Sequence, residues 1–121
     1  MTLYYLNDID PLATCNDGSP AGYYFAEGSG SSANLWIVYL EGSMFCWDLK
    51  SCTERYATHF YWMSSSAAPG WATSFAQGGI FATDGTSAWG NANRVYVKCV
   101  HLSGLPVSPG ADTAARQVLH F

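Results

Sequence analysis

The sequence predicts a fold of the α/β class, and three patterns along the chain predict it. Residues 35–40 (LWIVYL) form an unbroken apolar run, which is typical of a strand buried on both faces of a sheet. A helical pattern follows over residues 51–63, and a second strong strand pattern covers residues 94–100. These elements describe part of a sheet that is accompanied by one or two helices and long loops.

Two further strands are expected before the apolar run. Residues 3–6 and 22–26 are both rich in aromatic and apolar side chains of the kind that favour strands. A segment with many turn-forming residues separates them, including Gly18 and Pro20, so the two strands would open the fold as a hairpin. In the last strand, alternate side chains such as Val95 and Val97 would share one face.

The helix over residues 51–63 is expected to begin at Ser51, which can cap it with Glu54 three residues later. Tyr56, Phe60 and Met63 then recur at the spacing of one helix face. A second, shorter helix is expected over residues 111–121. Residues 64–70 and 77–93 are rich in Ser, Ala, Gly and Asn, so they are expected to be mainly loops.

Composition and charge exclude several classes of protein. Hydrophobic residues make up 49% of the 121 residues and charged residues 12%, which excludes a disordered polar chain. The formal net charge is −4 and no basic cluster occurs, so no nucleic-acid partner is expected. No apolar run approaches the roughly 20 residues of a membrane-spanning helix. The first residues lack the basic and apolar regions of a secretory signal peptide.

Four cysteines suit an oxidising compartment: Cys15, Cys46, Cys52 and Cys99. They allow three disulfide pairings, and four buried thiols remain the alternative. No CxxC pair occurs and the three histidines are scattered, so the spacing of a zinc site is absent. No metal or other cofactor is expected.

Several motifs in the same order resemble the Notum and pectin-acetylesterase family. Residues 15–24 (CNDGSPAGYY) match a characteristic segment near the start of that family, and residues 36–42 (WIVYLEG) resemble its WLLFLEGG strand and loop. Cys46 and Cys52 have the family's six-residue separation. Three further matches follow at residues 55–65, 79–81 and 89–97, so the resemblance spans about residues 3 to 100.

The resemblance implies an α/β-hydrolase fold, of which residues 1–121 would be a single, incomplete domain. It implies a secreted serine carboxylesterase that acts on an acyl ester, either an acylated protein or an acetylated polysaccharide such as pectin. It also implies that Cys46 pairs with Cys52 and Cys15 with Cys99. The first of these disulfides would close a small loop directly after Gly42 and stiffen it.

In the family, two backbone amides after the LEG motif form the oxyanion hole. These positions are Ser43 and Met44 here, where the family has glycine and tryptophan. Backbone amides survive a change of side chain, so Ser43 and Met44 are the candidate oxyanion donors. Gly42, Glu41 and Arg55 are expected to support the loop. Because a buried carboxylate is costly unless it is paired, we expect an ion pair between Glu41 and Arg55, with a solvent-facing Glu41 as the alternative.

No residue of this chain is assigned a catalytic role. Hydrolysis of this type needs a serine in a GxSxG turn, a histidine base and an acid, and no serine here fits GxSxG. His59, His101 and His120 lack a serine-histidine-acid arrangement, and His59 is expected to pack against aromatic rings. In the family, the nucleophile turn follows the helix that residues 111–121 would begin.

Three interpretations remain open from the sequence. The chain is either part of an esterase whose complete protein carries the catalytic triad, or a non-catalytic homologue whose aromatic side chains bind a carbohydrate or a protein. A small disulfide-stapled sandwich would explain the strands and cysteines, but not the order of the motifs.

Overall fold

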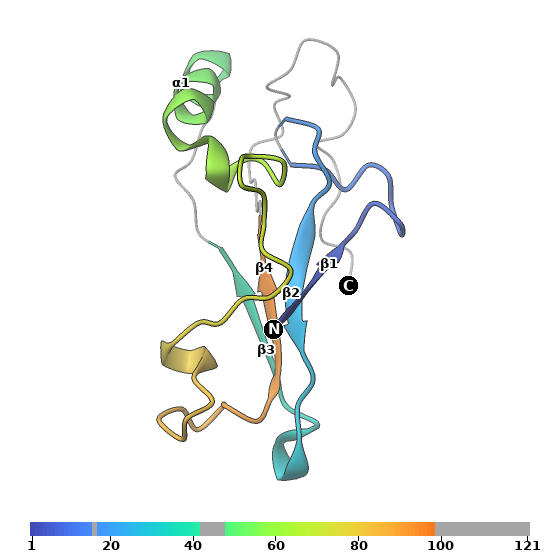
Figure 1. Ribbon diagram of the computed structural model, residues 1–121, viewed down its shortest axis with the longest axis vertical. Helices are drawn as coiled ribbons and strands as arrows, with labels where there is room; N and C mark the ends of the chain where they lie inside the picture. Colours follow the sequence, from blue (N-terminus) through green and yellow to red (C-terminus); the bar gives the residue numbers. More distant parts are fainter. Residues whose placement is uncertain (16, 42–47, 99–121) are drawn as a thin grey trace.

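The computed structural model describes residues 1–15, 17–41 and 48–98. They form a four-stranded sheet with a helix beyond one end of its central strands and loops at the other end (Figure 1). The strand order is β1-β2-β4-β3, and only the pair of β3 and β4 is parallel. The bounds are Thr2–Tyr5 for β1, Gly22–Ala26 for β2, Trp36–Leu40 for β3 and Asn93–Val97 for β4.

Strands β1 and β2 form the predicted antiparallel opening. Leu3 lies opposite Tyr24, and Tyr5 lies opposite Gly22. The turn-rich segment between the strands has a small core of its own, in which the buried residues Ala13, Cys15 and Ala21 pack against Leu6 and Trp71. Trp71 comes from a distant part of the chain, so this packing fixes the long β1–β2 connection against the rest of the molecule.

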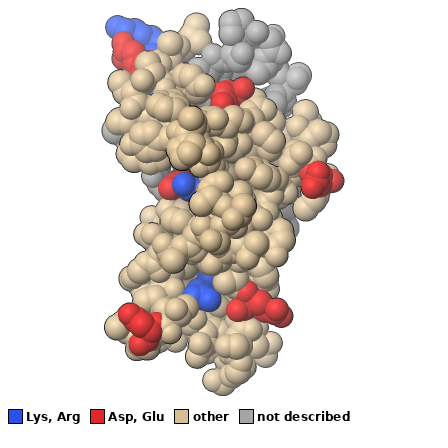
Figure 2. Space-filling model, viewed as in Figure 1, with Lys and Arg blue, Asp and Glu red and all other residues tan. Residues whose placement is uncertain are grey.

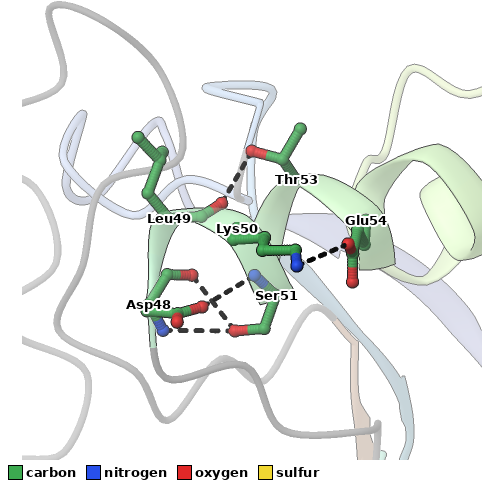
Figure 3. Close-up of polar contacts among 6 residues, drawn as sticks. All are labelled: Asp48, Leu49, Lys50, Ser51, Thr53 and Glu54. Atoms are coloured by element: carbon green, nitrogen blue, oxygen red, sulfur yellow. Dashed lines mark hydrogen bonds and ion pairs between the residues drawn. The ribbon is translucent and has the colours of Figure 1, made fainter.

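The helix begins earlier than the sequence pattern predicted. Helix α1 spans Leu49–His59, and short 3-10 helices follow at Phe60–Trp62 (η2) and Gly79–Phe81 (η3). Its N-cap is Asp48, whose carboxylate accepts a hydrogen bond from the Ser51 amide at 2.7 Å (Figure 3). Ser51 is therefore the third residue of the helix, and its hydroxyl accepts the Asp48 amide at 3.2 Å. The sequence prediction missed that Asp48 is the stronger cap.

The main core lies on one face of the sheet, which we call the covered face. Tyr24 of β2 and Tyr96 of β4 are buried there against Phe81 of η3. Phe75 adds ring contacts at 5.0 Å between centroids with both tyrosines. These two phenylalanines come from the loop-rich connection between α1 and β4, which crosses this face in Figure 1. The predicted loops at residues 64–70 and 77–93 are confirmed, apart from η3 and from Asn93, which begins β4.

The same connection also covers the outer edge of β1. The Leu3 amide donates to the Thr73 carbonyl at 3.0 Å, and the Phe75 amide donates to the Met1 carbonyl at 2.9 Å. Because an unpaired sheet edge invites association with other chains, this contact protects β1. Strand β3, at the opposite edge, has no such cover among the described residues.

The prediction that residues 35–40 are buried on both faces is wrong. Trp36 is 60% exposed, Val38 52% and Leu40 43%, because β3 is an edge strand with one uncovered face. An unbroken apolar run indicates that a strand is suited to burial on both faces. It does not indicate whether this chain contains the packing layer that would cover each face.

The Asn93 side chain joins the start of β4 to the loop between β2 and β3. Asn93 is 5% exposed. Its amide nitrogen donates to the carbonyls of Ala33 at 2.7 Å and Leu35 at 3.1 Å, and its oxygen accepts the Gly28 amide at 2.8 Å. Only glycine allows this close approach at position 28, because a Cβ there would lie 2.6 Å from the backbone nitrogen of Asn93 and would clash with it. The side chain thereby sets where β3 begins beside β4.

Replacing Asn93 by alanine is expected to destabilise the fold by about 1–3 kcal/mol, because the partly buried Gly28 amide and the Ala33 carbonyl lose this partner, whereas the Leu35 carbonyl keeps the Asn93 backbone amide. Urea unfolding followed by circular dichroism measures this loss. Asn91→Ala, at an exposed neighbouring position, is the matched control and should change stability by less than about 0.5 kcal/mol. Equal effects of the two substitutions would contradict the role of Asn93.

The Asp48 cap is expected to make stability depend on pH in the acid range. Hydrogen bonds from Ser51 hold the pKa of Asp48 below its ordinary value of 3.8. A carboxyl whose pKa is lower in the folded state stabilises the fold above the unfolded pKa, and this contribution is lost as the pH falls through the folded pKa. Melting temperatures from about pH 5 to about pH 2 measure it.

Asp48→Asn is the control for this measurement, because asparagine caps a helix but does not titrate. Its melting temperature should fall less steeply than that of the unmodified protein over the same pH range. Identical slopes for the two proteins would contradict the assignment of Asp48.

Candidate functional site

The carboxyl ends of the parallel strands β3 and β4 lie at the same edge of the sheet and carry the described part of the candidate site. Leu40 pairs with Val97, so the next residues, Glu41 and Lys98, emerge side by side. The Glu41 amide donates to the Val97 carbonyl at 2.9 Å, which keeps the backbone in the sheet up to this residue. The candidate oxyanion residues Ser43 and Met44, with Gly42, follow directly and lie outside the described residues.

Glu41 is paired, but with a different cation from the one predicted. Its Oε1 lies 3.6 Å from the Lys98 Nζ, and both side chains are 17% exposed. The Tyr96 hydroxyl donates to the same oxygen at 3.1 Å. Among the described residues no ion pair joins Glu41 to Arg55, so the expected pairing is wrong. The parallel register brings Lys98 to Glu41, whereas the prediction assumed that the following helix supplied the partner.

The Lys98 ammonium group also lies over two aromatic rings. Its Nζ is 5.5 Å from the centre of the Trp71 ring and 5.9 Å from that of Phe75. Both distances allow cation–π attraction. Glu41, Lys98 and these rings form a compact cluster at the carboxyl ends of β3 and β4, and Glu41 immediately precedes the candidate loop in the sequence.

Burial raises the pKa of Tyr96 well above its ordinary value, and the neighbouring Glu41 carboxylate raises it further. The hydroxyl therefore remains protonated near neutral pH and donates to Glu41. The tyrosine does not ionise near neutral pH, so it acts toward Glu41 as a hydrogen-bond donor.

Arg55 lies on the inward face of α1, next to Cys52. The two are the buried residues of this helix, and Arg55 is 6% exposed. Burial lowers the pKa of the Arg55 guanidinium, and its Nε has no hydrogen-bond partner among the described residues. Arg55 thus contributes to packing under the helix, and its expected support of the loop stays a prediction.

Two of the motifs noted in the sequence meet through a serine cluster. Ser19 follows Gly18 in the CNDGSP segment, and its hydroxyl oxygen accepts the Ser65 amide at 2.9 Å and lies 3.5 Å from that of Ser64. Burial raises the pKa of Asp17, but hydrogen bonds from Ser19 and Ser64 outweigh it, so that the pKa lies below its ordinary value. These motif residues therefore hold two segments together, and none of their described hydrogen bonds involves His59, the one histidine within residues 1–98.

The cysteines and His59 complete the set of predicted residues. Cys15 is 4% exposed and Cys52 is fully buried, and neither is a free thiol. Their expected partners, Cys46 and Cys99, lie outside the described residues, as do His101 and His120. His59 lies among aromatic rings, 4.9 Å from Trp62 between centroids, which agrees with the predicted packing role.

The described part of the chain offers no other reactive arrangement. It contains no group of three or more His, Cys, Asp or Glu side chains arranged to hold a metal ion. None of its helices is long and apolar enough to cross a membrane. Sequence reasoning missed Tyr96 and Lys98, and the signal that could have found them was their position at the end of a second strand in the same sheet.

Comparison with known families decides the family. The model of the pectinacetylesterase family matches residues 1–103. The chain belongs to the pectinacetylesterase family. This membership confirms the resemblance that the motifs indicated. The matched residues include Glu41, Lys98 and the candidate loop.

Within the pectinacetylesterase family, several relatives match over most of this chain. It is 44% identical over 86 residues to palmitoleoyl-protein carboxylesterase notum1' of Xenopus laevis, covering 69% of this chain and 17% of that protein. It is 40% identical over 91 residues to palmitoleoyl-protein carboxylesterase NOTUM of Homo sapiens, covering 74% and 17%. The chain thus spans about a sixth of the length of these two relatives.

A shorter relative is covered more completely. Inactive palmitoleoyl-protein carboxylesterase notum1b of Danio rerio is 41% identical over 86 residues, which are 69% of this chain and 58% of that protein.

A solved structure shows the same fold. The Wnt deacylase Notum from Drosophila superposes with a TM-score of 0.70 at 34% identity, covering 82% of this chain and 27% of that one. The chain therefore has part of an α/β-hydrolase fold, as the resemblance implied.

The corrected pairing of Glu41 can be tested by two double-mutant cycles. Glu41→Gln and Lys98→Met are expected to couple by about 1–2 kcal/mol, because the pair is mostly shielded from water. Glu41→Gln and Arg55→Met should be additive within about 0.5 kcal/mol. Urea unfolding of the single and double variants gives both values, and the reverse order of coupling would contradict the structure.

Proposed function

We propose that residues 1–121 are the amino-terminal portion of a carboxylesterase that hydrolyses O-acyl esters, forming a single, incomplete α/β-hydrolase domain. One observation carries the proposal. The loop that provides oxyanion donors in this family leaves the sheet at Glu41, and Glu41 is fixed there by Lys98 and Tyr96. A loop that begins from a fixed point can hold its amides in position before substrate arrives.

In this proposal Ser43 and Met44 donate their backbone amides to the oxyanion. Gly42 lets the backbone turn sharply after the strand. A disulfide between Cys46 and Cys52 would close the loop against α1, and one between Cys15 and Cys99 would tie the β1–β2 connection to the end of β4. The burial of Cys15 and Cys52 supports both pairings. Arg55, buried beside Cys52 on α1, would support the loop from the helix.

This chain alone is proposed to be inactive. Acyl transfer needs a serine hydroxyl activated by a histidine, and a single oxyanion loop does not replace them. Among the described residues no hydrogen bond joins a serine to His59, and the described serines that are buried, Ser64 and Ser65, bond to the CNDGSP segment.

The substrate class follows from the relatives. Two of them are named as carboxylesterases for palmitoleoyl proteins, and the family is that of pectinacetylesterases. The complete protein would therefore act on an acylated protein or an acetylated polysaccharide outside the cell. Buried cysteines that are not free thiols fit an oxidising, secreted location. The charged groups on the face in Figure 2 are sparse and of both signs, which favours neither nucleic acid nor another strongly charged partner.

A second candidate function is a non-catalytic homologue that binds a carbohydrate or a protein. The zebrafish relative favours it, because that protein is named inactive and this chain covers more than half of it.

Ester hydrolysis separates the two candidates. The 121-residue chain is expected to release no p-nitrophenol from acetate or octanoate esters above a buffer control. A polypeptide that includes the downstream coding sequence should do so, and a serine-directed inhibitor should abolish its activity. Hydrolysis by the 121-residue chain that this inhibitor stops would contradict the proposal. A stop codon directly after Phe121 in the transcript would favour the non-catalytic homologue.

A further inference from the structure

The face of the sheet opposite the covered face carries apolar side chains from all four strands, and we call it the open face. Alternation along each strand places these side chains together, and the pairing registers join them across the sheet. The described residues leave this face uncovered, so that even Val95 on the central strand β4 is only half-buried. The side chains of the open face are those of Tyr4, Tyr23, Phe25, Trp36, Val38, Leu40, Val95 and Val97.

The open face has two chemically different halves. Strands β1 and β2 contribute tyrosine and phenylalanine rings. After Trp36, the parallel strands β3 and β4 contribute an aliphatic half, in which Val38 lies opposite Val95 and Leu40 lies opposite Val97. These four side chains have no hydrogen-bonding group, so a saccharide would find no polar partner there. Aliphatic and β-branched side chains are typical of parallel strands that helices cover, so the aliphatic half favours a helix as its cover.

The two edges of the sheet indicate where a further strand would pair. The Glu41 amide points to β4, so alternation along β3 directs the amides of Val38 and Leu40 to the outer edge. These amides have no backbone partner among the described residues, whereas the outer edge of β1 is bonded to Thr73 and Phe75. A strand that follows in the complete protein would therefore pair with β3.

The handedness of connections decides which face the segment after β4 would cross. Connections between parallel strands of one sheet are right-handed in about 98% of cases. The connection from β3 to β4 runs over the covered face, where its Phe75 and Phe81 pack (Figure 1). A connection from β4 to a strand beyond β3 crosses the sheet in the opposite direction, so the same handedness places it over the open face. Its path lies over β4 and β3, which carry the aliphatic half.

The sequence after β4 has the pattern of a helix with one apolar side. Residues 99–121 lie outside the described residues, and a helix is expected over residues 111–121. At about 100° per residue, the apolar side chains of this helix fall within one continuous arc and the polar ones within the other. The apolar arc contains Ala111, Ala114, Ala115, Val118, Leu119 and Phe121, and the polar arc contains Asp112, Thr113, Arg116, Gln117 and His120.

The length of this predicted helix matches the sheet. Residues 111–121 at about 1.5 Å each would extend about 16 Å, and a strand as long as β3 extends about 17 Å. The helix would lead the chain from the carboxyl ends of β3 and β4 back to their amino ends, where a further parallel strand would begin. With its side chains a helix is about 10 Å wide, so it covers two strands about 4.8 Å apart.

We propose that the helix expected over residues 111–121 packs its apolar side on the aliphatic half of the open face. Ala111 and Ala115 lie at the centre of the apolar arc, and their small side chains let the helix approach Val38 and Val95 closely. Neither surface carries a charge, so the contact buries no charged group. The inference rests on the incomplete domain of the proposed function, because it needs a strand beyond β3, but it does not depend on esterase activity.

The reactivity of a thiol at position 38 of the 121-residue chain tests whether the open face is covered. In Val38→Cys, N-ethylmaleimide should modify the introduced thiol at least about tenfold more slowly than in Leu49→Cys, because only the first lies under the helix. Leu49 is the matched control, since it is an apolar residue that is 65% exposed on α1. Peptide mass spectrometry identifies the modified residue and so separates it from the native cysteines.

Substitutions within the predicted helix test whether it is the cover. Added to Val38→Cys, Val118→Asp should speed the modification at least about fivefold, because it places a charge in the apolar contact. Gln117→Asp, in the polar arc of the same helix, should change the rate by less than about twofold. Val118→Ser should act in the same direction to a smaller extent, and it replaces Val118→Asp if that variant loses the circular dichroism spectrum of the fold.

Three kinds of result would overturn the proposal. Equal rates in Val38→Cys and Leu49→Cys would mean that the open face is not covered. Slow modification that neither Val118 variant relieves, or that Gln117→Asp relieves equally, would mean that another segment covers it. Protection that grows with protein concentration would show a second copy on this face instead. None of these rates depends on ester hydrolysis, so the failure of this inference and the failure of the proposed esterase activity are distinguishable.

Discussion

The parallel pairing of β3 with β4 is the constraint on which the rest of the structure depends. It brings Glu41 and Lys98 together at one edge of the sheet, and it places Tyr96 under both. The Asn93 side chain secures this pairing where the strands begin, by satisfying backbone groups of the loop that leads into β3. Three hydrogen bonds at one end of two strands thus determine which side chains meet at the other end.

Local features of the fold could be read from the sequence, because they depend on neighbouring residues. The antiparallel opening, the helix after the apolar strand and the long loops follow from turn residues and apolar spacing. The helix start was placed three residues late, because Ser51 and Asp48 both have capping side chains and only the backbone shows which is the cap.

Features that depend on distant residues could not be read in the same way. The partner of Glu41 was sought on the next helix, although it lies at the end of a strand more than fifty positions later, in a register that no local pattern reveals. The exposure of Trp36 and Val38 was missed for the same reason, because a strand pattern records the side chain and not its neighbours. The candidate loop was identified through family motifs. Such motifs give the order of segments along the chain, but they do not give the distances between side chains.

The two edges of this sheet differ in a way that gives it a direction of growth. Backbone groups of Met1, Leu3, Thr73 and Phe75 occupy the outer side of β1, so a further strand cannot add there without displacing them. Beside β3 the corresponding groups remain accessible in the described chain. Any polypeptide that enlarges this sheet must therefore join it at β3. Such a strand would lie next to the strand that leads directly into Glu41.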